Sequence, residues 1–185
     1  MKKIHLLTAL VASFASFSFA NAASYNIDPA HSSIEFKVSH FGFSYVIGRF
    51  DDFEGTFSYD SAAPEKSEVM VTIDTKSINS NHSARDKHLK SDDFLMTGKY
   101  PLSTFKATGF KVVDEENIVM SADFTLHGVT KSIEIDVAKI GECKDPWGGH
   151  RVGFEGSFSF TMDEFAFNQN FGEVMIAITV EGIKQ

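Results

Sequence analysis

The chain has 185 residues, and its 25 acidic and 17 basic side chains give a net charge of −8. This acidic balance argues against nucleic acid or an anionic membrane surface as the main partner. Cys143 is the only cysteine, so an internal disulfide is excluded.

The first 22 residues have the three parts of a secretory signal peptide. Lys2 and Lys3 precede an apolar run over residues 6–19, and Ala20-Asn21-Ala22 offers an A-x-A cleavage site after Ala22. The apolar run is short for a membrane anchor, so we expect no stable membrane insertion. Cleavage would remove the two lysines with the signal peptide, so the net charge of the remaining domain is −8 − 2 = −10. We expect a periplasmic protein with one domain over residues 23–185.

The domain alternates apolar and polar residues almost throughout, as antiparallel strands with one buried face do. The alternation covers residues 32–41, 68–75, 118–126, 133–137, 152–160 and 174–180. The phase reverses between residues 44–50 and 53–59, which predicts a bulge or bend at Asp51-Asp52. About eight such strands favour an all-β, up-and-down antiparallel barrel, with a sandwich as the alternative.

Residues 78–101 lack this alternation and carry helix signals instead. Ser83 is the expected N-cap, Asp86 lies in the first turn, and Lys87 and Lys90 lie toward the end. A helix this short needs a surface to dock on, so we place it across one mouth of the barrel.

The same segment holds the best candidates for chemistry. His82 and Asp86 are four residues apart, but a third good ligand is missing and Arg85 would repel a cation, so we expect no metal site and no cofactor. A small hydrolase using His82, Asp86 and His88 is the enzymatic alternative, although nucleophile motifs are lacking and Cys143 lies in an apparent hairpin loop.

Phenylalanine is the strongest compositional signal, with sixteen of nineteen in the domain. Apolar side chains on the inward phase are expected to line a ligand-binding lumen. They are Phe36, Val38, Phe50, Phe57, Phe105, Phe124, Phe154 and Phe158. A filled core that leaves only the surface for function is the alternative. His31 and His40 are either structural histidines or hydrogen-bonding groups at a mouth.

The chain resembles the YceI-like family of bacterial secreted proteins over nearly the whole domain. The resemblance rests on "YNIDPAHSSIEFKVSHFGFSYVIGRFDDFEGTF", "SINSNHSARDKHLKSDDFLMTGKYPLSTFKA" and "ADFTLHGVTKSI". It implies an extended, lipocalin-like barrel that binds a polyisoprenoid lipid or isoprenoid quinone, with no established enzymatic activity. Arg85, Asp86 and His88 fall in the family's RD-x-H-L block, where they would either meet a polar head group or pin the helix. Near the C-terminus, Met162 and Ala166 replace the family's usual arginine and glycine.

We therefore expect a non-enzymatic periplasmic protein that carries or stores one apolar lipid, and we leave a homodimer open as a further partner.

Overall fold

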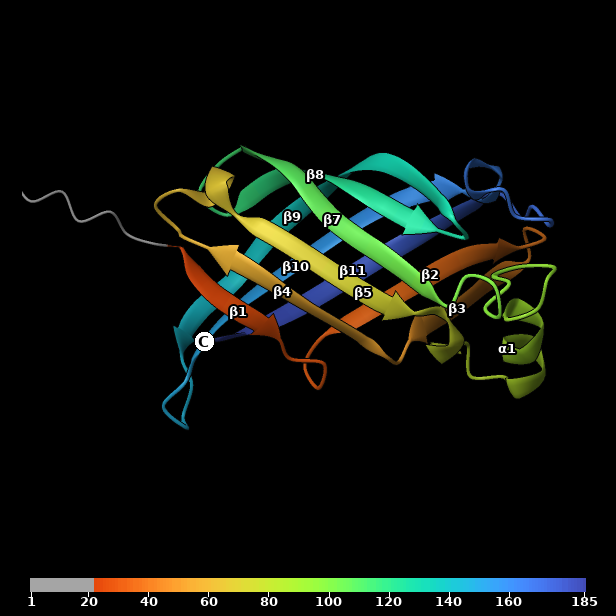
Figure 1. Ribbon diagram of the computed structural model, residues 1–185, viewed down its shortest axis with the longest axis horizontal. Helices are drawn as coiled ribbons and strands as arrows, with labels where there is room; N and C mark the ends of the chain where they lie inside the picture. The colour runs from red at the N-terminus through yellow and green to blue at the C-terminus, as the bar shows by residue number, and fades with distance from the viewer. Residues whose placement is uncertain (1–21) are drawn as a thin grey trace, which may run out of the picture.

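The computed structural model describes residues 22–185 (Figure 1). The predicted signal peptide lies outside the described residues, apart from Ala22. The strands are β1 Ala23–Ile27, β2 Ser33–His40, β3 Ser44–Phe50, β4 Phe53–Tyr59, β5 Glu68–Asp74, β6 Ile78–Asn79, β7 Leu102–Val112, β8 Asn117–Leu126, β9 Val129–Lys144, β10 His150–Thr161 and β11 Glu173–Lys184. The helices are α1 Ser83–Leu89 and the 3₁₀ turns η1 Pro64–Lys66, η2 Thr75–Ser77 and η3 Met162–Phe165.

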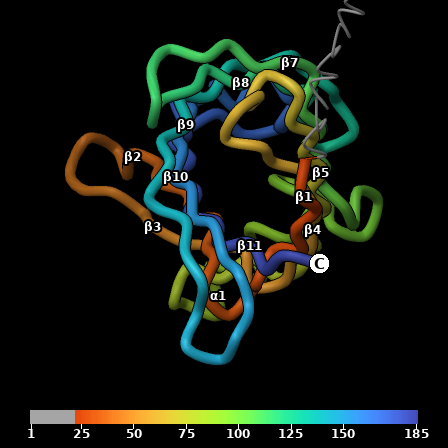
Figure 2. Tube along the Cα trace, turned by 90° about the vertical axis from the view of Figure 1, so that its left-hand side faces the viewer, coloured from red at the N-terminus to blue at the C-terminus, as the bar shows by residue number. Residues whose placement is uncertain are grey.

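Eight strands form a closed antiparallel ring. Their order is β1-β4-β5-β7-β8-β9-β10-β11, and pairing between β1 and β11 closes it. The tube view shows the strands of this ring arranged around a common axis (Figure 2). The all-β barrel of about eight strands is thus confirmed, and a sandwich is not formed.

Three further strands extend the barrel at one end. β11 pairs with β1 through residues 182–184 and with β2 through residues 174–179, so β1 and β2 follow one another along it. β3 pairs with β2, and β6 pairs with β3. Helix α1 lies at the same end of the barrel (Figure 1).

The phase change at Asp51-Asp52 is a break between two strands rather than a bulge within one. β3 ends at Phe50 and β4 begins at Phe53, and the two pair with different neighbours. Backbone hydrogen bonds from Asp51 to Ser77 and from Asp74 to Asp52 tie the break to the β5 side. The break lets Val46 and Phe50 of β3 and Phe53 and Phe57 of β4 all face the interior.

The short helix begins one residue earlier than its sequence signals indicate. The N-cap is His82, whose Nδ1 accepts a hydrogen bond from the backbone N–H of Arg85 at 3.2 Å, and Ser83 is the first helical residue. The expected serine cap is therefore wrong, because a histidine ring nitrogen takes its place. α1 is seven residues long. None of the described helices has the length and apolar character needed to cross a membrane.

Glycines in the strands make room for inward-pointing rings. A Cβ on Gly48 would clash with the ring of Phe36, and one on Gly182 would clash with the ring of Phe57. Because any side chain at either position would displace a buried ring, these glycines mark where aromatic residues meet the barrel wall.

Candidate ligand-binding cavity

The barrel encloses an elongated apolar cavity of about 440 Å³. This volume is within the range of small-molecule sites, about 300–1,000 Å³. All eight predicted lumen residues line it: Phe36, Val38, Phe50, Phe57, Phe105, Phe124, Phe154 and Phe158. The interior is therefore not a completely filled core.

The cavity follows the strands for most of the length of the barrel. On β8 alone, Ile118, Met120, Phe124 and Leu126 line it. From Ile118 to Leu126 is eight residues, which corresponds to roughly 26 Å along a strand. A site of this length and apolar character suits a long hydrocarbon chain better than a compact polar ligand.

Aromatic rings form the wall without filling the space. Phe124 lies at the centre of one group, with ring centroids 5.4 Å from Phe158, 6.0 Å from Phe160 and 5.3 Å from Phe165. Phe158 lines the cavity and is only partly buried.

The mouth is built from helix α1, the end of β2 and irregular segments near them. Arg85, His88 and Leu89 of α1 line the cavity there, as does His40 at the end of β2. Four further aromatic side chains complete the lining at this end: Phe41, Phe94, Phe167 and Phe171. Sequence reasoning missed these four, although their aromatic character beside a predicted mouth helix is a usable signal.

Arg85 is held in place at the mouth by the segment before its own helix. Its Nε donates to the hydroxyl of Ser80 at 2.7 Å and its Nη2 donates to the Ser80 carbonyl at 2.6 Å. Among the described residues, Nη1 has no hydrogen-bond partner. Arg85 therefore pins the helix and also brings a fixed positive charge to the cavity wall.

Asp86 belongs to the same network but does not line the cavity. Its Oδ1 accepts hydrogen bonds from the backbone N–H and the hydroxyl of Ser80. Burial acts to raise the pKa of Asp86, but the Ser80 hydrogen bonds and the nearby Lys90 and Arg85 outweigh it and lower the pKa. The geometry supports the structural interpretation of Asp86.

His82, Asp86 and His88 each form a hydrogen bond with a different partner. His82 caps the helix, Asp86 accepts from Ser80, and His88 Nε2 lies 3.0 Å from Oδ2 of Asp93. The three do not form a metal-ligand cluster within the part of the chain that the structure describes. The arrangement that the hydrolase alternative needs is not assembled here.

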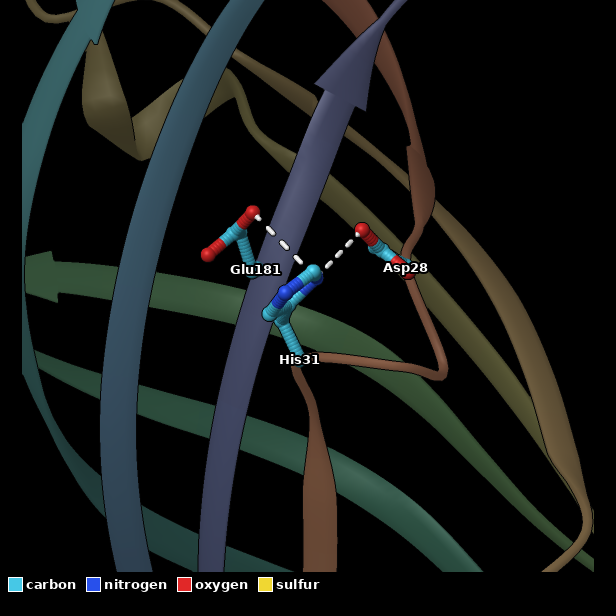
Figure 3. A group of neighbouring side chains, drawn as sticks. All are labelled: Asp28, His31 and Glu181. Atoms are coloured by element: carbon cyan, nitrogen blue, oxygen red, sulfur yellow. Dashed lines mark hydrogen bonds and ion pairs between the residues drawn. The ribbon is translucent and has the colours of Figure 1, made fainter. Parts of the chain in front are cut away.

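His31 lies in the β1–β2 turn and does not line the cavity. Its Nδ1 is 2.9 Å from Oδ2 of Asp28 and 4.0 Å from Oε1 of Glu181, and the three side chains point toward one another (Figure 3). The geometry thus gives His31 a place in an ion-pair cluster on the barrel wall, whereas His40 is at the mouth.

Arg151 connects this cluster across the barrel wall. Its Nη1 donates to Asp28 at 2.7 Å and to Glu181, and its Nε donates to Asp145 at 2.9 Å. The hydrogen bonds from His31 and Arg151 lower the pKa of Asp28 to about 2. The three carboxylates together hold the pKa of Arg151 above its usual value.

Asp28, His31 and Glu181 are also close enough to share a cation, since their ligand atoms lie within 4.8 Å of one another. The Arg151 guanidinium already donates hydrogen bonds to Asp28 and Glu181, and its positive charge would repel a metal ion at the same place. We interpret the cluster as a structural ion-pair network.

One of the two departures from the family pattern lines the cavity, and the other is exposed. Met162 is buried and lines it, so an apolar thioether stands where an arginine is usual. Ala166 ends η3 with φ of +54°, in the left-handed region that favours glycine. Met162 makes this part of the cavity wall more apolar. The positive φ at residue 166 is the physical reason why glycine is usual at that position.

A closed antiparallel barrel around an elongated apolar cavity is the architecture of proteins that enclose a small ligand. Residues 25–181 match the YceI-like domain, and the chain belongs to the YceI-like family. It is similar to UPF0312 proteins of Shewanella baltica and Shewanella denitrificans, each 46% identical over 192 residues, with 100% of both chains covered.

Solved structures share this fold. A YceI protein of Campylobacter jejuni is 30% identical with a TM-score of 0.74, covering 80% of this chain and 91% of its own. BcnA of Burkholderia cenocepacia is 17% identical with a TM-score of 0.75, covering 84% and 98%. A polyisoprenoid binding domain from Saccharophagus degradans is 17% identical with a TM-score of 0.66, covering 89% and 100%.

Proposed function

We propose that this protein binds a polyisoprenoid lipid or an isoprenoid quinone, with the prenyl chain inside the barrel and the polar head at the α1 mouth. The observation that carries the proposal is the long cavity, which is lined by phenylalanine and aliphatic side chains from both the barrel and its extension. The description of the Saccharophagus degradans domain as polyisoprenoid binding supports the same class of ligand.

The energetics favour a long chain. Each buried CH₂ contributes about 0.8 kcal/mol, so some twenty carbons give a gross gain on the order of 15 kcal/mol before ordering costs. At the mouth, Arg85 offers hydrogen-bond donors and His88 offers an imidazole ring to an oxygen-rich head group. The arrangement serves binding, and we propose transport or storage of the lipid rather than catalysis.

We further propose that the protein works in the periplasm. The support is the tripartite signal over residues 1–22. Export would place a lipid carrier in the aqueous space between two membranes, where a prenyl chain needs a protected apolar environment.

Titration of the ligand-stripped protein with a prenyl quinone in mild detergent tests this function. The proposal expects saturable binding of one quinone per barrel, and it expects a quinone without its prenyl tail to bind far more weakly. Equal affinity for the two compounds would show that the cavity does not recognise the chain.

A further inference from the structure

An uncharged apolar tip projects from the barrel extension beside the cavity mouth. Phe41, Phe43, Tyr45 and Ile47, on the β2–β3 hairpin and the start of β3, are all exposed, and Phe43 is 87% exposed. These are four of the ten exposed large apolar side chains in the described chain, and they lie within seven consecutive residues. Such concentration marks an interaction surface, since single exposed apolar residues are ordinary and clustered ones are not.

The tip breaks the alternation that shapes the rest of the barrel. Tyr45 pairs with Ser39 and Ile47 pairs with Lys37 across the β2–β3 ladder. Val46, between Tyr45 and Ile47, lines the cavity, so Tyr45 and Ile47 occupy the opposite, outer phase of β3, where polar residues are the rule. Nothing in the barrel core requires these two side chains to be apolar.

The tip has no charged residue of its own, and the charge beside it is the ammonium group of Lys37, 4.0 Å from the centroid of the Tyr45 ring. Residues 38–48 contain no aspartate, glutamate, lysine or arginine, whereas the domain after the predicted cleavage carries −10. An acidic protein is repelled by an anionic surface. A zwitterionic bilayer imposes no such penalty, and aromatic side chains are favoured at its interface.

The exposed tip is continuous with the cavity wall. Phe41 is 69% exposed and also lines the cavity. Its ring contacts that of Phe171 at a centroid distance of 5.7 Å, and Phe171 stacks on Phe94 at 5.8 Å. Both partners line the mouth. An apolar path therefore runs from the outside of the hairpin into the barrel.

Resting on the proposed function, we propose that the β2–β3 hairpin tip docks on the surface of a zwitterionic lipid bilayer and holds the cavity mouth against it. Phe43, Tyr45 and Ile47 enter the interfacial layer, and Phe41 lies between the bilayer and the cavity. A prenyl chain then passes between membrane and barrel without crossing water. A second copy of the chain fits this surface less well, because it would bring a second charge of −10 alongside.

Flotation with phosphatidylcholine vesicles that contain no prenyl ligand tests the docking. The double variant Phe43→Ser/Tyr45→Ser removes two exposed rings that do not line the cavity. It should lower the vesicle partition coefficient at least tenfold. The matched control is Trp147→Ser, which removes an 81% exposed ring from the β9–β10 hairpin and should leave the partition coefficient unchanged. Replacing part of the phosphatidylcholine with phosphatidylglycerol should weaken binding at low salt.

Three results would overturn the docking surface. The first is a wild-type partition coefficient no higher than background. The second is a double variant that floats as well as the wild type. The third is a wild-type dimer, detected by sedimentation, that the double variant does not form. Quinone affinity in detergent micelles is measured in parallel, and the double variant should retain it. A wild-type protein that binds quinone but does not bind the vesicles contradicts only the docking, whereas a wild-type protein that binds no quinone contradicts the proposed function.

Discussion

Arg85 donates hydrogen bonds from Nε and Nη2 to the hydroxyl and the carbonyl oxygen of Ser80, and its side chain lines the cavity mouth. The residue thus joins helix α1 to the segment that follows β6 while presenting a positive charge to the interior. The interpretations as a structural residue and as a head-group residue are therefore compatible, and they can be measured separately.

Replacing Arg85 with alanine should have two effects. Loss of charged hydrogen bonds should lower the free energy of unfolding of ligand-free protein by about 1.5–3 kcal/mol. Affinity for a prenyl phosphate should also fall more than affinity for the prenyl alcohol of equal length, because only the phosphate gains from the guanidinium. Denaturant melts and paired titrations measure the two effects. Equal losses for phosphate and alcohol would leave Arg85 with a structural role only.

A bulky residue inside the cavity should block the ligand without unfolding the barrel. Ile178 lines the cavity and is only partly buried, so Ile178→Trp should abolish quinone binding and cost the fold about 1–3 kcal/mol. Ala177 is exposed on the same strand, and Ala177→Trp should bind quinone as the wild type does. Quinone binding that survives in Ile178→Trp would place the ligand elsewhere.

The barrel and its lining were predictable because strand alternation is a local signal. Phe36 and Val38 share one phase of β2, and the fold turns that phase inward. Phe94 and Phe171 were not predictable in this way, since they lie in irregular segments whose positions depend on tertiary packing. The link between Asp28 and Arg151 spans 123 residues, and no local pattern reports such a contact.

The Asp28–Arg151 network should make stability depend on acid pH. The folded pKa of Asp28 is about 2, below the ordinary value of about 3.9. Because the folded pKa is depressed, the stabilisation is fully present above the unfolded pKa and is lost as the pH falls toward 2. Asp28→Asn should therefore melt at a lower temperature than the wild type at pH 7. The difference should shrink below pH 4, and a difference that stays constant down to pH 2 would exclude this carboxylate as its source.

Metal removal should leave the protein unchanged. Arg151 occupies the carboxylates of the Asp28 cluster and repels a cation there, and His82, Asp86 and His88 have separate partners. Dialysis against EDTA should alter neither the melting temperature nor quinone affinity. A lower melting temperature that Zn²⁺ or Ca²⁺ restores would show that the Asp28 cluster holds a metal ion.

The most direct test of lipid binding is organic extraction of the full chain expressed and purified from a bacterial periplasm without detergent, followed by mass spectrometry. The gross gain on the order of 15 kcal/mol for a long prenyl chain should retain the lipid through purification. The account predicts one prenyl lipid in near-equimolar amount with the protein, and none in Ile178→Trp purified in the same way. An extract from the wild type that contains no lipid, or the same lipid at the same level in both proteins, would contradict it.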